Sequence, residues 1–350
     1  MNKKRTLVTV AVVAVLCLLV YLQVHAWKKF DWATFWSNTQ HVNWAYVAGS
    51  VAIIYFLYVL RAVRWRIFLK PMCETTTGRL IAPQFIGFAG LALLGRAGEV
   101  VRPYVIAKKE NLTLTSQLGV WTVERIFDMG SVAFMFVVVV FLGDPLWKTL
   151  PNTHLQAEVR WSALAFLAGI LVLTSAAVVL RRSGHAIAER LEQRLARRSQ
   201  GFAHGVRTKI DAFTDGLQVI SDASSFVQLF ALSMVMWALV GVSYWLIVHA
   251  YGGRLAELGP ASIAVLMVAA MFGSLLQLPG VGGGSQLATI AVLSGIFGVE
   301  SEVAVSCGML IWLATFMSVI PMGLFLAHRE RLSLRAVASA EHDEQAALEK

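Results

Sequence analysis

Charge is scarce in this sequence, and its scarcity decides the class of protein. Only 15% of the 350 residues are charged, whereas 57% are hydrophobic, and the mean hydropathy is +0.65. Soluble globular domains carry about 25% charged residues. The shortage of charge therefore excludes an ordinary soluble domain and predicts an integral membrane protein.

Cysteine and the common catalytic motifs are also missing or rare. The three cysteines, Cys17, Cys73 and Cys307, are too scattered for a disulfide framework, and no Cys or His pair has metal-ligand spacing. There is no HExxH, no DxD pair and no Walker P-loop. We expect no metal and no cofactor, and any chemistry would have to take place within the membrane.

The formal net charge of +9 comes from Lys and Arg that lie between apolar runs rather than within one basic domain. Such placement follows the positive-inside rule, so the charge predicts topology and not nucleic-acid binding. The basic N-terminal MNKKR and the late HRERLSLR are both expected on the cytoplasmic side. Several Trp residues, such as Trp44 and Trp161, lie at the ends of apolar runs, as in an interfacial belt.

Long apolar runs predict six full membrane spans. The expected spans are residues 6–26, 44–60, about 129–142, 161–180, about 226–249 and about 303–327. A cleaved signal peptide is the alternative for the first run, but its apolar stretch exceeds the roughly 7–15 residues usual for one.

Two further apolar segments are too short or too broken to span. LIAPQFIGFAGLALL, residues 80–94, has basic segments on both sides, so it is expected to enter and leave from the cytoplasm. The segments 261–277 and 287–299 flank the break LPGVGGGSQ and are expected to form a hairpin that enters from outside. The predicted fold is an all-α polytopic membrane bundle with two re-entrant elements and inverted pseudo-symmetry.

One domain is expected, over residues 1–333, followed by a polar C-terminal tail at 334–350. Within the domain, residues 181–225 form the most polar segment and carry many arginines. Their spacing predicts a cytoplasmic amphipathic surface helix that faces solvent or lipid headgroups.

Three charges follow the first re-entrant run, in the stretch GRAGEVVRP at residues 95–103. Arg96, Glu99 and Arg102 are spaced by three, so on a helix they share one side, which Pro103 would kink or end. Two arginines around one glutamate leave a positive group that can grip a phosphate bidentately. The alternative is a structural Arg96–Glu99 ion pair with a topogenic Arg102; charges at membrane depth are costly, which favours a site.

A second charged group, VERIFD, follows at residues 123–128. Glu124 and Asp128 are one helical turn apart, and Arg125 can pair within its own helix and still reach a neighbour. Two interpretations stay open: ion pairs that hold the first re-entrant element in place, or direct contact with a substrate.

The glycine-rich break LPGVGGGSQ, residues 278–286, lies between two apolar half-helices. Such a break exposes backbone N–H groups and the positive end of a half-helix, which favours an anion. A flexible turn whose glycines allow close helix packing is an equally open alternative.

These three motifs in this order resemble the flippase-like transmembrane family related to the membrane region of lysylphosphatidylglycerol synthases. The resemblance extends over about residues 42–327, and the first two motifs are its more specific part. It implies an all-helical domain that moves lipid, or a lipid-linked headgroup, between leaflets, in aminoacyl-phospholipid, hopanoid or polyprenyl-lipid pathways. It also implies no lipid aminoacylation, because the cytosolic domain that performs it in the synthases is not among these 350 residues.

The resemblance also implies functional positions. The family's charged positions fall on Arg96, Glu99, Arg102, Glu124, Arg125 and Asp128, and its late glycine motif falls on Pro279, Gly280 and Gly283. This sequence departs from the family at Gln286, where an acid is frequent, and at Trp312, where an arginine is common. Losing both together leaves neither as an unpaired buried charge, and it argues against a mechanism that needs a carboxylate in the second re-entrant loop.

We expect a lipid flippase or transporter of the cytoplasmic membrane without a catalytic step. Arg96, Arg102 and Arg125 would hold the phosphate of an anionic or isoprenoid lipid, oriented by Glu99 and Asp128, with the glycine break as the opposing wall. The expected substrate-binding residues are Arg96, Glu99, Arg102, Glu124, Arg125, Asp128, Gly280, Gly283 and Gln286.

Two alternatives belong to other functional classes. One is an intramembrane glycosyl- or lipid-modifying transferase that uses Glu99, Glu124 or Asp128 as a general base. The other is a scaffold that binds a lipid-biosynthesis enzyme through residues 181–225. A lipid-sized cavity lined by arginines favours transport, an acid over a second nucleotide-sized pocket favours the enzyme, and a filled bundle favours the scaffold.

Overall fold

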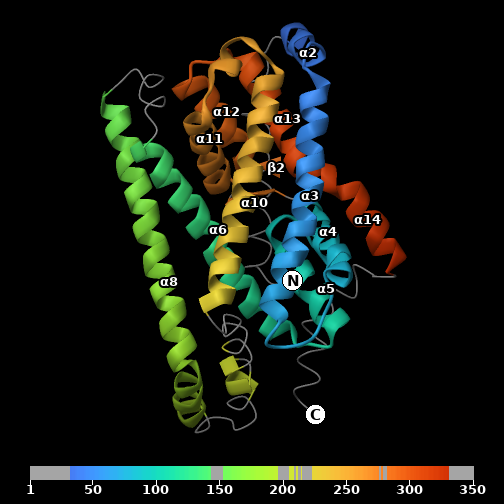
Figure 1. Ribbon diagram of the computed structural model, residues 1–350, viewed down its shortest axis with the longest axis vertical. Helices are drawn as coiled ribbons and strands as arrows, with labels where there is room; N and C mark the ends of the chain where they lie inside the picture. Colours follow the sequence, from blue (N-terminus) through green and yellow to red (C-terminus); the bar gives the residue numbers. More distant parts are fainter. Residues whose placement is uncertain are drawn as a thin grey trace, which may run out of the picture.

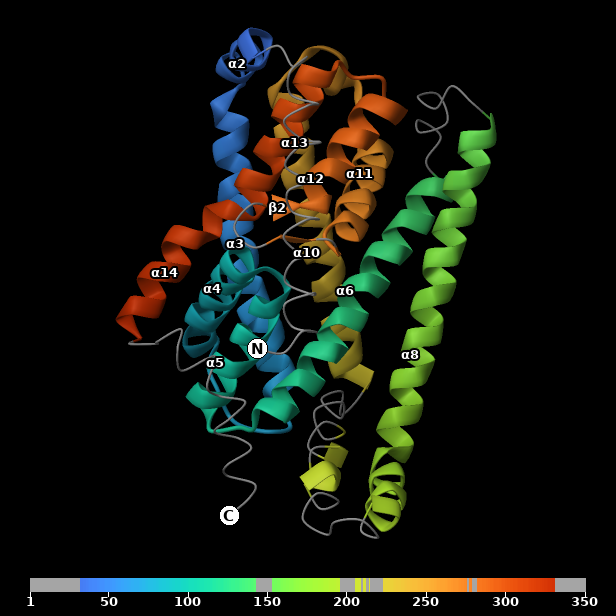
Figure 2. The same ribbon diagram turned by 180° about the vertical axis from the view of Figure 1, so that it is seen from behind.

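A computed structural model describes residues 32–142, 153–195, 205–208, 210–211, 214, 223–275, 277–278 and 282–330. The first expected span, residues 6–26, and the expected C-terminal tail, residues 334–350, lie outside these ranges. Within them the chain folds into a bundle of helices, shown in Figures 1 and 2.

In the described part of the chain, six helical segments are long and apolar enough to cross a membrane. They lie in α3 (Trp44–Leu69), α4 (Thr77–Leu94), α6 (Leu114–Leu142), α8 (Thr153–Leu195, with its apolar part at Gln156–Ala176), α10 (Ala223–Ala250) and the segment Ser301–Arg329, which comprises α13 (Ser301–Thr315), the 3-10 turn η4 (Met317–Val319) and α14 (Ile320–Arg329). The prediction of an all-α polytopic membrane bundle is therefore confirmed. The large residues on the outer faces of these helices, such as Leu171 and Phe325, are apolar and exposed, as lipid contact requires.

The segment expected to be re-entrant forms a hairpin made of α4, the 3-10 turn η1 (Gly95–Val100) and α5 (Val101–Glu110), although α4 is itself long and apolar enough to span. Gly95 has φ 64°, a backbone conformation that favours glycine, and it ends α4. The helices then pack closely, because a Cβ on Gly87 would lie 2.2 Å from Cβ of Arg102. Both ends of the hairpin lie toward the lower end of the bundle in Figure 1, as expected for a segment that enters and leaves on one side.

Two local expectations for this hairpin are wrong. The stretch GRAGEVVRP does not form one helix, since η1 occupies residues 95–100 and a new helix begins at Val101. Pro103 does not end that helix but lies in its first turn, where its missing N–H would have had no intrahelical acceptor. The three charges of this stretch therefore do not line one helical face.

The second hairpin is made of α11 (Pro260–Gly273), two short strands and α12 (Gly284–Ala291), with the 3-10 turn η2 (Gly253–Glu257) before it. The strands β1 (Gln277–Leu278) and β2 (Gly282–Gly283) pair antiparallel, and α12 continues into a π turn, η3 (Val292–Ile296). Figure 2 shows α11 and α12 in the upper half of the bundle, opposite α4 and α5. The strand β1 contacts η1, so the tips of the two hairpins meet within the bundle.

Three helices differ in length from the sequence-based expectation. α3 continues past residue 60 to Leu69, and α6 begins at Leu114 rather than near residue 129. α8 continues to Leu195 as one helix of 43 residues, so the first part of the expected separate surface segment 181–225 extends the span. At 1.5 Å per residue α8 is about 65 Å long, roughly twice the thickness of the hydrocarbon core.

The last expected span, about 303–327, is bent rather than straight. α13 ends at Thr315, and Pro321 lies in the first turn of α14. α14 then packs on α4, where a Cβ on Gly323 would lie 2.4 Å from Cβ of Ala89. α14 points away from the axis of the bundle and covers the first hairpin (Figure 1).

Candidate functional site

A buried arginine on α3 holds the two acids of VERIFD. Arg64 donates from Nη2 to Oε1 of Glu124 at 2.5 Å and from Nη1 to Oδ1 of Asp128 at 2.6 Å. The same Nη1 donates to Oγ of Ser233 on α10 at 3.0 Å. The side chains of Arg64 and Glu124 are fully buried. Because α3 and α6 both continue through this depth, their charged residues face each other instead of ending in solvent.

A second arginine approaches Glu124 from the first hairpin. Arg102 in α5 pairs with Oε2 of Glu124, donates to Oε1 at 3.0 Å, and donates to Oε1 of Gln84 at 3.2 Å. Its guanidinium also lies 4.4 Å from the ring centroid of Trp65. Glu124 therefore ties α5 to α3 through two cations, and both of its oxygens are engaged. This arrangement fixes the hairpin against the bundle.

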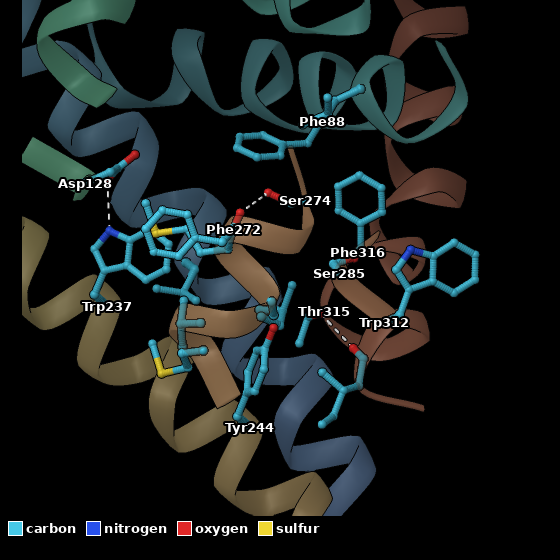
Figure 3. Close-up of a pocket in the computed structure, with 18 of the residues that line it drawn as sticks. Phe88, Asp128, Trp237, Tyr244, Phe272, Ser274, Ser285, Trp312, Thr315 and Phe316 are labelled. Atoms are coloured by element: carbon cyan, nitrogen blue, oxygen red, sulfur yellow. Dashed lines mark hydrogen bonds between the residues drawn. The ribbon is translucent and has the colours of Figure 1, made fainter. Parts of the chain in front are cut away.

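Arg125 and Trp237 complete the ion network at its open side. Arg125 forms an ion pair with Asp128, with 2.8 Å between Nη2 and Oδ2, and its Nη2 lies 3.5 Å from Oε2 of Glu124. The indole N–H of Trp237 donates to Oδ1 of Asp128 at 3.1 Å (Figure 3). The Arg125 side chain keeps 32% of its surface exposed, whereas the two acids are buried. Arg125 is thus the member of this network that a ligand can reach.

Arg61, one helical turn before Arg64, differs from the other arginines in its partners. Its guanidinium lies over the rings of Phe88, at 4.5 Å from the centroid, and Tyr58, at 6.0 Å. Among the residues that the structure describes, no carboxylate forms an ion pair with it. Stacking on aromatic faces stabilises a guanidinium without neutralising it. Arg61 therefore adds a positive charge that no described carboxylate contacts directly.

These groups border a central cavity of about 340 Å³. Its charged lining residues are Arg61, Glu99, Arg102, Arg125 and Asp128. The facing side is formed by α11, α12 and α13, which contribute neutral residues, among them Ser285, Gln286 and Trp312. Counting the buried Arg64 and Glu124, four arginines face three acids, so the described part of the cluster carries one net positive charge. Figure 3 shows Asp128 and Trp237 on one side of the cavity and Ser285, Trp312 and Phe316 on the other.

The structure brings most of the expected site residues to this cavity. Glu99, Arg102, Arg125, Asp128 and Gln286 line it, and Glu124 lies behind them as the buried counter-ion. Glu99 and Asp128 were expected to orient the arginines; the acid paired with Arg102 is Glu124 from α6. The change of helix type at residue 100 removes the spacing on which that expectation depended.

The remaining expected residues belong to the two hairpin tips. Arg96 falls within η1, but its side chain lies outside the described part of the chain, as does Gly280. Gly283 ends β2 and donates its backbone N–H to Oε1 of Gln286 at 2.6 Å. Gln286 thus caps the first turn of α12 and simultaneously lines the cavity.

Sequence reasoning missed the central role of α3. Arg61 and Arg64 belong to a basic group that looks topogenic, because it follows an apolar run and resembles a cytoplasmic flank. A signal was present: these two arginines continue the helical spacing of Leu57 and Tyr58, and Trp65 and Phe68 follow on the same buried side. Charges aligned with an apolar buried face indicate a partner inside the bundle.

Comparisons with known proteins agree on the membrane class. The family model described as the lysylphosphatidylglycerol synthase TM region matches residues 7–323. A UPF0104 membrane protein of Methanothermobacter thermautotrophicus is 22% identical over 284 residues, covering 80% of this chain and 82% of that protein. Glycosyltransferase AglD of Haloferax volcanii is 27% identical over 225 residues, covering 59% of this chain. The match takes in only 36% of that glycosyltransferase's length.

Proposed function

This chain belongs to the family of lysylphosphatidylglycerol synthase transmembrane regions, and from that premise we propose that it moves a phosphate-bearing lipid between leaflets. The substrate is an anionic or isoprenoid lipid, and the activity is a transport step without catalysis. We place it in the cytoplasmic membrane with both termini cytoplasmic, as the basic flanks of the apolar runs favour.

The observation that carries this proposal is Arg61 on the wall of the cavity, which no described carboxylate contacts directly. A cation at membrane depth without a paired counter-ion is costly, so such residues mark a substrate pathway. A lipid phosphate is a matching counter-ion, because guanidinium groups bind it through two parallel hydrogen bonds. Arg61 supplies the first contact, and Arg125, which is 32% exposed, supplies a second while it keeps its ion pair with Asp128.

The roles expected for the other charged residues change accordingly. Arg102 and Glu124 are buried and paired with each other, so they position the hairpin rather than hold the ligand. Phosphate contact passes from the expected Arg96, Arg102 and Arg125 to Arg61 and Arg125. The meeting of two opposed hairpins at the cavity supports alternating access by movement of one unit against the other.

The transferase alternative finds less support in the geometry of the acids. Both oxygens of Glu124 accept from arginines, and Asp128 accepts from Arg64 and Trp237 and forms an ion pair with Arg125. A carboxylate surrounded by cations in this way is a weak general base. The glycosyltransferase name belongs to a relative of which this chain matches 36%.

The test is the sidedness of a labelled anionic lipid in reconstituted vesicles. A fluorescent phosphatidylglycerol is bleached from outside by an impermeant reductant, with and without an imposed proton gradient. Arg61→Gln is expected to slow exchange about tenfold or more, the worth of one charge-assisted contact. Arg66→Gln is the matched control, because Arg66 lies on the same helix but is exposed away from the cavity. Equal rates for wild type and Arg61→Gln would contradict the proposal.

A further inference from the structure

The cavity divides into a charged wall and an uncharged wall. Every charged residue that lines it within the described ranges belongs to α3, η1, α5 or α6. The described lining of α11, α12 and α13 holds only neutral residues, which include hydroxyl, amide and indole groups next to apolar ones. If the phosphate of a lipid binds Arg61, the headgroup attached to that phosphate therefore contacts the uncharged wall.

The uncharged wall offers several hydrogen-bonding groups to a ligand. Nε1 of Trp312 is buried and has no hydrogen-bond partner in the described part of the chain. Oε1 of Gln286 accepts from the backbone of Gly283, which leaves its amide NH₂ as the group it can offer. Ser285 adds a hydroxyl from the first turn of α12. A buried donor without a partner costs free energy, so a ligand that supplies an acceptor here gains affinity.

We propose that the headgroup beyond the phosphate is an uncharged polyol, such as a sugar or an inositol, held by Trp312, Gln286 and Ser285. This inference rests on the proposed function, since it takes the phosphate at Arg61 as its anchor. A polyol carries many hydroxyl oxygens that accept from indole and amide donors and also donate in return. It requires no counter-charge from the wall.

A cationic headgroup is disfavoured by the same arrangement. An ammonium group beyond the phosphate would lie between a charged wall with one net positive charge and a wall that holds no acid. Taking a cation out of water without a carboxylate partner is expensive. Aromatic faces that line the cavity attract a cation, but by about 2 kcal/mol, less than the cost of desolvating an ammonium group without a carboxylate. Gln286 and Trp312 are thus specificity-determining residues for headgroup charge.

The test compares phosphodiester lipids that differ only in headgroup. Phosphatidylmethanol, phosphatidylinositol and phosphatidylethanolamine with identical acyl chains compete against a fluorescent phosphatidylglycerol for the purified full chain in detergent. The methyl headgroup supplies the phosphate alone, the inositol adds an uncharged polyol, and the ethanolamine adds an ammonium. Phosphatidylinositol is expected to bind about tenfold more tightly than phosphatidylmethanol, because its headgroup adds one to two hydrogen bonds. Phosphatidylethanolamine is expected to bind more weakly than phosphatidylmethanol.

Two variants assign the preference to the uncharged wall. Trp312→Phe removes the N–H and keeps an aromatic ring, so it should reduce the advantage of phosphatidylinositol over phosphatidylmethanol to about threefold or less. Gln286→Glu keeps the oxygen that accepts from Gly283 and adds a negative charge. It should raise the affinity for the ethanolamine lipid relative to the methyl lipid by about tenfold. Gel filtration verifies that both variants fold.

The outcomes separate this inference from the proposed function. The polyol inference is overturned if the three lipids bind equally, or if phosphatidylethanolamine binds more tightly than phosphatidylinositol. If Arg61→Gln still lowers the affinity for all three lipids in that case, the phosphate site stands. An inositol advantage that survives in Trp312→Phe with Ser285→Ala also overturns it. If Arg61→Gln leaves every affinity unchanged, the proposed function fails, and the polyol inference fails with it. An inositol advantage that Trp312→Phe removes supports both.

Discussion

Glu124 is the residue whose neutralisation should disturb the structure most. It is fully buried and paired with Arg64 and Arg102, so Glu124→Gln keeps its shape but leaves Arg102 buried without a carboxylate. Removing one partner of a buried ion pair costs about 3–5 kcal/mol. The ratio of folded to unfolded protein should therefore fall by roughly two to four orders of magnitude.

A matched control comes from the surface of the same hairpin. Glu110 pairs with Arg79 at 3.1 Å; its own side chain is 5% exposed, but the Arg79 side chain is 54% exposed. Glu110→Gln therefore leaves behind an arginine that water can solvate, and it should cost far less than Glu124→Gln, about 0–1 kcal/mol. The difference between the two substitutions measures the burial of the arginine that loses its partner, because both remove one carboxylate charge from an arginine pair.

The assay is denaturation in mixed micelles, read out by labelling of Cys307 with a thiol-reactive dye. Cys307 is fully buried and becomes reactive on unfolding, whereas Cys17 and Cys73 are replaced by serine. The double variant Arg102→Gln/Glu124→Gln should be more stable than the sum of its single variants, by about 1–3 kcal/mol. If Glu124→Gln costs no more than Glu110→Gln, or if the two single effects simply add, the buried network does not exist as described.

Two further predictions concern the first hairpin. Gly87→Ala should destabilise the protein by about 1–3 kcal/mol, because its new Cβ would lie 2.2 Å from Cβ of Arg102. Gly78→Ala on the same helix meets no atom within 4 Å, so it should be neutral or slightly stabilising. Thermal unfolding in detergent compares the two variants, and equal effects would refute the close packing. Single cysteines introduced at Lys70 and at Lys108 should react with an impermeant thiol reagent from the same side of the membrane, and one at Gln40 should react from the other side. Labelling of Lys70→Cys and Lys108→Cys from opposite sides would show that the hairpin is a full span.

Composition and hydropathy were sufficient to predict the membrane bundle, because lipid requires long apolar helices whatever their packing. The first hairpin was also predictable, since short length and basic flanks on both sides restrict its path. The ends of α3, α6 and α8 were not predictable. A helix continues for as long as neighbouring elements pair its charged residues, and such pairing depends on tertiary contacts that hydropathy does not contain.

The charged residues of the site illustrate the same limit. GRAGEVVRP and VERIFD predict that two arginine–acid groups lie close together, and Arg102 and Glu124 do form a pair. Their counter-ion Arg64 comes from a distant helix, and its role depends on the way α3 crosses α6. Likewise, the unused indole N–H of Trp312 and the amide of Gln286 become a common wall only when the second hairpin folds back beside α13.

The central claim, that a lipid phosphate binds inside the cavity at Arg61, is tested most directly by locating that phosphate. An experimental density map of the wild-type chain in nanodiscs containing phosphatidylglycerol would show it. We expect a phosphate in the cavity within about 2.7–3.2 Å of the Arg61 guanidinium, between the ring of Phe88 and the wall formed by α12 and α13. A cavity that holds only acyl chains, with phosphates confined to the outer surface of the bundle, would contradict it.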